Sequence, residues 1–383
     1  MNDPQSRPTE LVLVGGGHAH ALVLHELARN PLHGTNITLI NPSPTAPYTG
    51  MLPGFIAGHY AREDLEIDLQ QLAARAGARL VLGKVDALDR QAGVVRGVGT
   101  GAIRFDIAAL DIGITSDLPM IAGYAPHAVS AKPLGEYARR WQDWLDKVRA
   151  GQIAPEIAVL GAGVAGVELA LAMSFRLRGH PHRMRIIDRG QALPHIGTYA
   201  RKRLLSHLAR FGIAVLEHTE VTGIEADHLR CADGQVIAAS FVVGVAGARP
   251  QDWLRATGLD HADGFIKVDQ YLRSLSDDRI FAVGDCAHMT HAPRPKAGVF
   301  AVRQAPFLLA NLRAALGGGA WRAYKPQRDY LKLVSLGGKT ALADKWGLPL
   351  EGRWLWQLKD GIDARFMRQF GLRDSDQPSR SPG

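Results

Sequence analysis

The stretch IAVLGAGVAGVE, residues 157–168, places an apolar run directly before a complete GxGxxG pattern at Gly161, Gly163 and Gly166. In this pattern the first glycine permits a tight turn, and the second lets a pyrophosphate approach backbone N–H groups. The third glycine lets a helix pack closely on the strand. The stretch therefore predicts a strand, a glycine turn and a helix that continues to Leu177.

The residue at the end of the next strand influences the choice between NADH and NADPH. A strand is predicted over 184–188, and Asp188 stands 22 residues after Gly166. A carboxylate at that place accepts hydrogen bonds from the adenosine ribose, so we expect NADH to be preferred to NADPH. Arg189, the next residue, weakens this preference.

The same order of elements occurs earlier in the chain, at VGGGHAHA, residues 14–21. Gly15 and Gly17 match the first two glycines, and His20 stands where the third belongs. Asn41 replaces the acidic residue expected at the end of the second strand. An asparagine still bonds a ribose hydroxyl, although less strongly than a carboxylate does.

Two such units, 146 residues apart, predict two different dinucleotides bound by one chain. The fold class that follows is α/β, with two Rossmann-like, doubly wound, three-layer domains. Segment 42–58 is rich in proline and glycine, so we expect a loop beyond the carboxyl end of the second strand. Ligands gather at that edge in doubly wound folds.

Composition excludes several classes of protein. A chain of 383 residues with 46% hydrophobic and 21% charged residues is typical of a soluble globular protein with two domains. The net charge of +8 is compatible with phosphorylated cofactors or a membrane surface. Aromatic and basic residues do not interleave as in proteins that read single strands, so no nucleic-acid partner is predicted.

Cysteine and histidine usage predicts neither a disulfide framework nor a metal site. Cys231 and Cys286 lie 55 positions apart without a CxxC pattern, so the cytoplasm is the expected compartment. The N-terminus contains no pattern of an export signal. His18 and His20 have no cysteine or carboxylate at a spacing that would complete a ligand set.

Further motifs carry a resemblance to a known family. FAVGDCA at 281–287, GVAGARP at 244–250, DIGITSDLP at 111–119 and YTGMLPG at 48–54 occur in this chain. With the two glycine loops, they resemble flavoproteins with two dinucleotide-binding domains, a group that includes disulfide reductases and type II NADH dehydrogenases. The resemblance covers nearly the whole chain and implies FAD and NADH as cofactors, with NADPH less favoured.

The resemblance implies that the NAD domain is inserted in the FAD domain. The expected FAD-binding domain comprises 1–118 and 250–320, and the NAD(P)H-binding domain comprises 119–249. A C-terminal appendage with an amphipathic basic helix follows over 321–372, and a tail over 373–383 is expected to be disordered. The residues expected to bind the two cofactors are Gly15, Gly17, His18, His20, Asn41, Met51, Leu52, Pro53, Val85, Gly113, Thr115, Gly161, Gly163, Val164, Ala165, Gly166, Asp188, Gly247, Gly284, Asp285, Lys296 and Ala297.

A subgroup matches more of the chain. VGGGHAHA at 14–21, PYTGMLPGFIAGHY at 47–60, PKAGVFAVRQ at 295–304 and GRWLWQLKDGIDARFM at 352–367 are similar to the flavin domain fused in front of selenide, water dikinase in some bacteria. His20 in place of glycine is usual in that subgroup. No kinase domain follows in this sequence, so the chain would be a stand-alone form.

The resemblance assigns the chemistry to the cofactors, which the protein orients and shields from water. Glu168 matches a glutamate near the nicotinamide in the dehydrogenase branch and is the expected catalytic residue. The alternative is a buried helix carboxylate with a structural hydrogen bond. No cysteine pair lies on the first long helix, so disulfide reduction is not expected, and Cys286 is expected to pack inside the flavin motif.

The identity of the electron acceptor stays open. Type II NADH dehydrogenases carry two glutamines beside the quinone, and this chain keeps Gln304 but has Val299 and Arg303 at the other polar places. Lys296 and Arg303 would suit an anionic acceptor or neutralise a reduced flavin. Three functions remain: a dehydrogenase that passes electrons from NADH to a quinone, a soluble reductase of a small selenium or sulfur compound or a carrier protein, and a non-catalytic redox sensor.

The C-terminal helix contains apolar and basic residues at helical spacing. Leu355, Leu358, Ile362, Phe366 and Phe370 are predicted to form one apolar stripe. Arginine and lysine outnumber the acidic residues around it. Two interpretations remain open: the stripe packs on the flavin domain, or 353–372 lies on the inner face of the cell membrane. A homodimer is compatible with the sequence.

Overall fold

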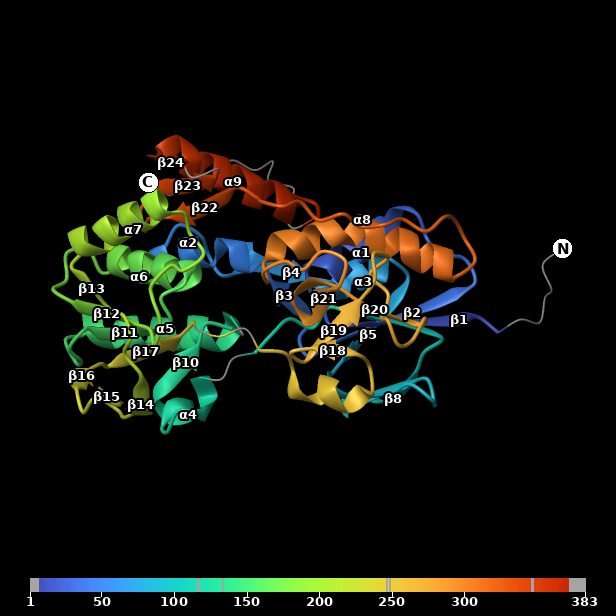
Figure 1. Ribbon diagram of the computed structural model, residues 1–383, viewed down its shortest axis with the longest axis horizontal. Helices are drawn as coiled ribbons and strands as arrows, with labels where there is room; N and C mark the ends of the chain where they lie inside the picture. The colour runs from blue at the N-terminus through green and yellow to red at the C-terminus, as the bar shows by residue number, and fades with distance from the viewer. Residues whose placement is uncertain are drawn as a thin grey trace, which may run out of the picture.

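The computed structural model describes residues 7–115, 118–132, 134–245, 247, 249–345 and 348–371. The expected disorder of 373–383 concerns residues outside this described part of the chain. Two five-stranded parallel sheets organise the molecule, each within its own lobe, as Figure 1 shows. This arrangement confirms the predicted α/β fold with two doubly wound units.

The first sheet has the strand order β20-β9-β1-β2-β5, with every pair parallel. Its strands are β1 (Thr9–Val14), β2 (Thr35–Asn41), β5 (Ala78–Leu82), β9 (Ile107–Leu110) and β20 (Ile280–Ala282). Helices α1 (His18–Arg29), α3 (Leu69–Arg75) and α8 (Gly298–Ala315) pack together on one side. The other side carries an antiparallel sheet of β6 (Lys84–Asp89), β7 (Val94–Val98) and β8 (Gly101–Arg104), which completes three layers.

The second sheet repeats this plan with the order β10-β17-β11-β12-β13. Its strands are β10 (Ala128–Ser130), β11 (Glu156–Leu160), β12 (Arg183–Ile187), β13 (Ile213–Leu216) and β17 (Phe241–Gly244). Alternate side chains of β11 enter two separate cores, because successive residues of a strand point to opposite faces. Ile157 and Val159 pack with the helices, and Ala158 and Leu160 pack toward the small antiparallel sheet.

The layers of the second unit are helical on one face and antiparallel on the other. The helices are α5 (Leu134–Arg149), α6 (Val164–Arg176) and α7 (Thr198–Arg210). The small sheet consists of β14 (Val221–Ile224), β15 (His228–Cys231) and β16 (Val236–Ala238). Its buried residues Leu229 and Ile237 belong to the second core.

The two connections between the lobes run side by side. The N–H of Thr115 donates to the carbonyl of Arg249 at 2.7 Å, and the N–H of Arg249 donates back at 2.9 Å. The chain therefore leaves the first sheet after β9 and returns to it at β20, with the whole second sheet formed between these points. This path supports an inserted domain, and the exact domain limits stay a prediction.

Segment 42–58 is more ordered than the predicted loop. It contains β3 (Thr45–Pro47) and α2 (Leu52–Ala57), and α2 packs on α6 of the second unit. β3 pairs with β4 (Glu66–Asp68). The prediction of a loop over this whole segment was wrong because Pro53 occupies the first turn of a helix, where proline is favoured, and Gly58 ends that helix in a left-handed conformation.

The appendage combines an antiparallel sheet with one long helix. The sheet contains β22 (Lys332–Ser335), β23 (Ala341–Lys345) and β24 (Leu348–Gly352), and α9 (Arg353–Arg368) follows directly. In Figure 1, α9 extends from the second lobe toward the first. The appendage therefore joins the two lobes on the side that carries α1 and α6.

The prediction of one apolar stripe on α9 was wrong. Leu355, Phe366 and Phe370 are buried, whereas Leu358 is 43% exposed and Ile362 is 49% exposed. Lys359 and Asp363 lie on the inward face of α9 instead. Lys359 donates to the carbonyl of Gly50, and Asp363 accepts from the hydroxyl of Tyr48. These polar partners lie far away in sequence, so helical periodicity alone placed the inward face incorrectly.

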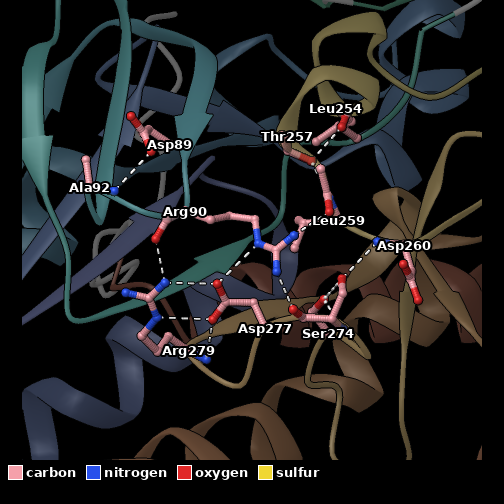
Figure 2. Close-up of polar contacts among 12 residues, drawn as sticks. Asp89, Arg90, Ala92, Leu254, Thr257, Leu259, Asp260, Ser274, Asp277 and Arg279 are labelled. Atoms are coloured by element: carbon pink, nitrogen blue, oxygen red, sulfur yellow. Dashed lines mark hydrogen bonds and ion pairs between the residues drawn. The ribbon is translucent and has the colours of Figure 1, made fainter.

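Ionic contacts connect the N-terminal part of the first lobe to the part of the lobe that follows the second sheet in sequence, as Figure 2 shows. The carboxylate of Asp277 accepts hydrogen bonds from Arg279 at 3.0 and 3.1 Å and from Arg90 at 3.3 Å. Arg90 follows β6 and also donates to the carbonyls of Gly258 and Ser276. The side chain of Asp277 is 8% exposed, so these bonds are shielded from water.

We predict that Asp277→Ala lowers the free energy of unfolding by about 1.5–3 kcal/mol, the value of hydrogen bonds to a charged group. The variant also leaves the guanidinium groups of Arg90 and Arg279 without this partner. Urea unfolding followed by circular dichroism measures the change. Asp278→Ala is the matched control, because the neighbouring side chain is 82% exposed. Equal stability of the two variants would contradict the prediction.

Candidate functional site

Each glycine loop is held by a side chain at the end of the neighbouring strand. In the first loop, the N–H of Gly16 donates to the side-chain oxygen of Asn41 at 2.9 Å. In the second loop, the N–H of Ala162 donates to the carboxylate of Asp188 at 2.7 Å. Asn41 and Asp188 thus make the same contact in the two units, which explains how an amide serves in place of the expected acid.

The second glycine loop has the form that a dinucleotide requires. Gly161 has a φ of 117°, and a Cβ on Gly166 would collide with the carbonyl of Gly161. Gly163 differs, because its φ is −71° and a Cβ there would meet no atom within 4 Å. Neither backbone conformation nor packing demands glycine at 163, so the open space beside it suits the close approach of a pyrophosphate. Val164 and Ala165 begin α6 at this edge.

His20 packs beneath the first loop. It is fully buried, and its Nδ1 lies 2.7 Å from the carbonyl oxygen of Gly15. Burial lowers the pKa of His20 to about 4, so its ring is neutral at physiological pH. The ring thus occupies the place where Gly166 packs in the second unit, and it holds the turn by a hydrogen bond instead.

His18 lies on the opposite side of the first helical turn, among aromatic rings. Its ring centroid is 5.3 Å from that of Tyr48 and 5.7 Å from that of Phe366. Burial lowers the pKa of His18 to about 4. A Cβ on Gly298, at the start of α8, would lie 3.5 Å from Nδ1 of His18. His18 therefore joins the first glycine loop to α8 and α9.

Asp111 directly follows β9 and lies against the first loop, although it was not among the site residues predicted from the sequence. One carboxylate oxygen accepts hydrogen bonds from the N–H groups of Ala19 at 2.9 Å and His20 at 3.2 Å. A Cβ on Gly17 would collide with this carboxylate. Its position directly after a buried strand was the available signal, since polar residues at that edge contact ligands in doubly wound folds.

The motif at 281–287 forms the short helix η5 (Gly284–Cys286) beside the first loop. The N–H of Gly284 donates to the amide oxygen of Gln304 at 2.7 Å, and the amide nitrogen of Gln304 contacts the sulfur of Met289 at 3.4 Å. Gln304 is 1% exposed, and its two polar ends contact Gly284 inside this motif and Met289 just beyond it. Arg303, in contrast, is exposed on α8.

Cys286 is a buried thiol within the same motif. Burial raises its pKa to about 12, so it stays protonated and unreactive. Asp285 beside it is partly exposed. Asp285, Lys296 and Ala297 line one small cavity of about 10 Å³. Lys296 is anchored there by the carbonyl of Ala287 and by the ring of Phe265, whose centroid is 3.9 Å from Nζ.

The loop at 48–54 and Glu168 meet under the appendage. Met51 ends the short helix η1 (Thr49–Met51), and Leu52 and Pro53 lie in the first turn of α2, which packs on α6; all three residues are buried. Glu168 on α6 accepts a hydrogen bond from the N–H of Ser335 at 2.7 Å. Burial raises the pKa of Glu168, whereas the nearby ammonium of Lys359 lowers it. The structural bond expected as the alternative is therefore present, and Ser335 also interacts with this carboxyl group through its side chain.

Lys359 and Asp363 on α9 bind the same loop. Nζ of Lys359 donates to the carbonyl of Gly50 and to Asp363, at 2.7 Å in each case. The hydroxyl of Tyr48 donates to Asp363 at 2.8 Å. Neither contact was predicted, because residues more than 300 positions apart are involved.

The remaining predicted site residues lie along the first lobe and at the crossings between the lobes. Val85 is buried in β6, Gly113 has a φ of 69°, and Gly247 has a φ of 83°. Thr115 pairs with Arg249. Gly113 and Thr115 follow β9 of the first sheet, whereas Gly247 follows β17, which pairs with β11 directly before the second glycine loop.

Within the described residues, no group of three or more His, Cys, Asp or Glu side chains is arranged to hold a metal ion. No helix in the same part of the chain is long and apolar enough to cross a membrane.

Known proteins resemble this chain over nearly its whole length. The NADH dehydrogenase-like protein YutJ of Bacillus subtilis is 26% identical over 371 residues, which cover 92% of this chain and 97% of that protein. Demethylphylloquinone reductase NdbB of Synechocystis is 25% identical over 365 residues, which cover 91% and 89%.

A solved structure shares the fold over nearly the whole chain. The structure of NDH2 from Plasmodium falciparum in complex with NADH matches with a TM-score of 0.79 at 13% identity, covering 95% of this chain and 98% of that one. A family model described as pyridine nucleotide-disulphide oxidoreductase matches residues 9–305, and the family implies FAD and NAD(P)H as cofactors. The chain therefore belongs to the pyridine nucleotide-disulphide oxidoreductase family and is a flavin-dependent pyridine nucleotide oxidoreductase.

Proposed function

We propose that the protein oxidises NADH through FAD and passes the electrons to a quinone. The observation that carries this proposal is the pairing of two glycine loops with the same backbone bond, to Asn41 in one and Asp188 in the other. The name of the Synechocystis relative describes reduction of a quinone, which supports the choice of acceptor. The chain has no cysteine pair that would support disulfide reduction.

The residues near the first loop suit FAD. Gly15, Gly17 and the N-terminus of α1 would receive its pyrophosphate, Asn41 its adenosine ribose, and Asp285 its ribityl hydroxyls. When bound, FAD accepts a hydride from the nicotinamide and delivers electrons singly or in pairs to the next acceptor. Met51, Leu52 and Pro53 would exclude water from the ring, and Lys296 supplies positive charge nearby.

The residues of the second loop would hold the nicotinamide coenzyme. Gly161, Gly163 and Gly166 shape the turn, and Asp188 is positioned to accept hydrogen bonds from the adenosine ribose. We propose a preference for NADH, because a carboxylate at Asp188 repels a 2′-phosphate at short range. Arg189 is the residue that opposes this preference.

The proposed function predicts two half-reactions. NADH should bleach the purified yellow protein in the absence of oxygen, more rapidly than NADPH, and a soluble quinone should restore the colour. Stopped-flow absorbance at the flavin band measures both steps. Failure of NADH to bleach the flavin would refute the function. If a small selenium or sulfur anion restored the colour and quinone did not, the protein would instead be a reductase of such compounds. That result would agree with the resemblance to the flavin domain fused to selenide, water dikinase.

For Glu168→Gln we predict slowing of one half-reaction on the order of 10²-fold, the lower end of general acid–base contributions. FAD content should stay unchanged, because the glutamine oxygen still accepts from the N–H of Ser335. The two half-reactions are timed separately by stopped-flow absorbance. Glu26→Gln, an exposed glutamate on α1, is the control. If both half-reactions keep their rates, Glu168 has only its structural role.

The outward face of α9 supports contact with a membrane surface. Trp354, Leu358 and Ile362 follow one another at intervals of four residues and are 54%, 43% and 49% exposed. The exposed side chains of Arg365 and Arg368 lie beside this apolar face. We propose that the face enters the headgroup region of an anionic membrane, where a quinone is dissolved.

Sedimentation with vesicles tests this contact. The full chain should pellet with vesicles of phosphatidylglycerol at low salt and be released by high salt, since each basic residue near the surface contributes about 1 kcal/mol. Leu358→Ser with Ile362→Ser should weaken pelleting at least tenfold without loss of FAD. Val98→Ser with Val236→Ser is the control, because these exposed valines lie on other surfaces. Equal pelleting of both double variants would contradict the proposed contact.

A further inference from the structure

Asp111 is a buried carboxyl group between the two parts of the first lobe. It is 5% exposed and directly follows β9, next to the N-terminus of α1. One oxygen, Oδ2, accepts the N–H groups of Ala19 and His20. The other oxygen, Oδ1, accepts no hydrogen bond from any described residue, so half of the group's bonding capacity is unused within the protein.

Glycines on both sides make room for this carboxyl group. A Cβ on Gly17 would collide with it, and a Cβ on Gly284 would lie 2.7 Å from Oδ1. Gly17 belongs to the first glycine loop and Gly284 to the motif at 281–287. The carboxyl group of Asp111 therefore separates the two segments that the proposed function assigns to FAD.

The electrostatics of this place are unfavourable for a charged carboxylate once FAD is present. Asp285 lies in the next segment and already contributes negative charge toward Asp111. The pyrophosphate of FAD would add two more negative charges at the N-terminus of α1, where Asp111 already occupies two N–H groups. A protonated Asp111 would avoid this repulsion and would offer an O–H from Oδ1 to a phosphate or ribityl oxygen.

We propose that Asp111 takes up one proton from solvent when FAD binds and, as a neutral acid, donates a hydrogen bond to the cofactor. Asp111 is thus a positioning residue that makes FAD affinity depend on pH. This inference rests on the proposed FAD site in the first lobe. It adds a proton to the binding reaction and leaves the electron transfer unchanged.

The pKa values of the surrounding groups single out Asp111 near neutrality. Burial, with a smaller contribution from Asp285, raises the pKa of Asp111 to about 7, although the N–H donors of Ala19 and His20 oppose the rise. Burial lowers the pKa of His20 to about 4 and raises that of Cys286 to about 12, so neither changes charge between pH 6 and 9. His18 behaves like His20, and burial lowers the pKa of Lys296.

The affinity for FAD falls as the pH rises, because the neutral form of Asp111 is the form that binds FAD. As the pH falls below 7 the carboxyl group becomes mostly protonated, so FAD binds with little proton cost. Above that pH the proton must be taken from solvent, and affinity falls by up to about tenfold for each pH unit. Asparagine at this position is neutral at every pH, and its side-chain oxygen can still accept from Ala19 and His20.

Equilibrium dialysis of the full chain against FAD at pH 6.0 to 9.0 tests the inference. We expect the Kd of the natural sequence to rise by about tenfold per unit above pH 7, and that of Asp111→Asn to stay low and nearly constant. Asp143→Asn, an exposed aspartate on α5, should behave like the natural sequence. A flat profile for the natural sequence, or an unchanged slope in Asp111→Asn, would overturn the inference.

Calorimetry gives a second measurement that needs no variant. FAD titrated into the chain at pH 8, in phosphate and in Tris, should give heats that differ by the ionisation heat of about one buffer proton. Equal heats in the two buffers would also overturn the inference, even if Asp111→Asn failed to fold. Absence of FAD binding at every pH would instead refute the proposed function, so the two failures are distinguishable.

Discussion

The hydrogen bond from the middle residue of each glycine loop to the end of the neighbouring strand is the constraint on which both sites depend. Gly16 donates to Asn41 and Ala162 donates to Asp188, each across the gap between two parallel strands. The bond fixes where the loop turns, and therefore where the following helix begins. The N-termini of α1 and α6 consequently point at the sheet edge where a dinucleotide phosphate is bound most favourably.

Features that depend on local sequence were predicted from it, and features that depend on distant partners were not. The strand and helix around the second glycine loop follow an apolar run that ends in glycine, so their positions agree with the structure within one or two residues. The inward face of α9 depends on Tyr48 and Gly50, more than 300 positions away. No periodicity in residues 353–368 contains that information, because a buried Lys359–Asp363 pair interrupts the apolar pattern.

The candidate site shows the same division. The spacing of one motif was enough to predict its geometry; this motif comprises Gly161, Gly163, Gly166 and Asp188. Asp111 has no such spacing, since it becomes significant only when β9 and β20 bring it between Gly17 and Gly284. The hydrogen bond from Gly284 to the amide oxygen of Gln304 has no signature in the spacing either, and the acceptor role expected of Gln304 stays a prediction.

The appendage links the chemistry of the site to the outer surface of the protein. The inward face of α9 holds Gly50 and Tyr48 beside the expected flavin ring, and β22 supplies the N–H that bonds Glu168. The outward face presents Trp354, Leu358 and Ile362 on the same helix. Because a helix of sixteen residues is stiff, displacement of one face displaces the other. An acceptor or membrane that contacts the outward face would therefore affect the loop at 48–54, which we propose shields the flavin.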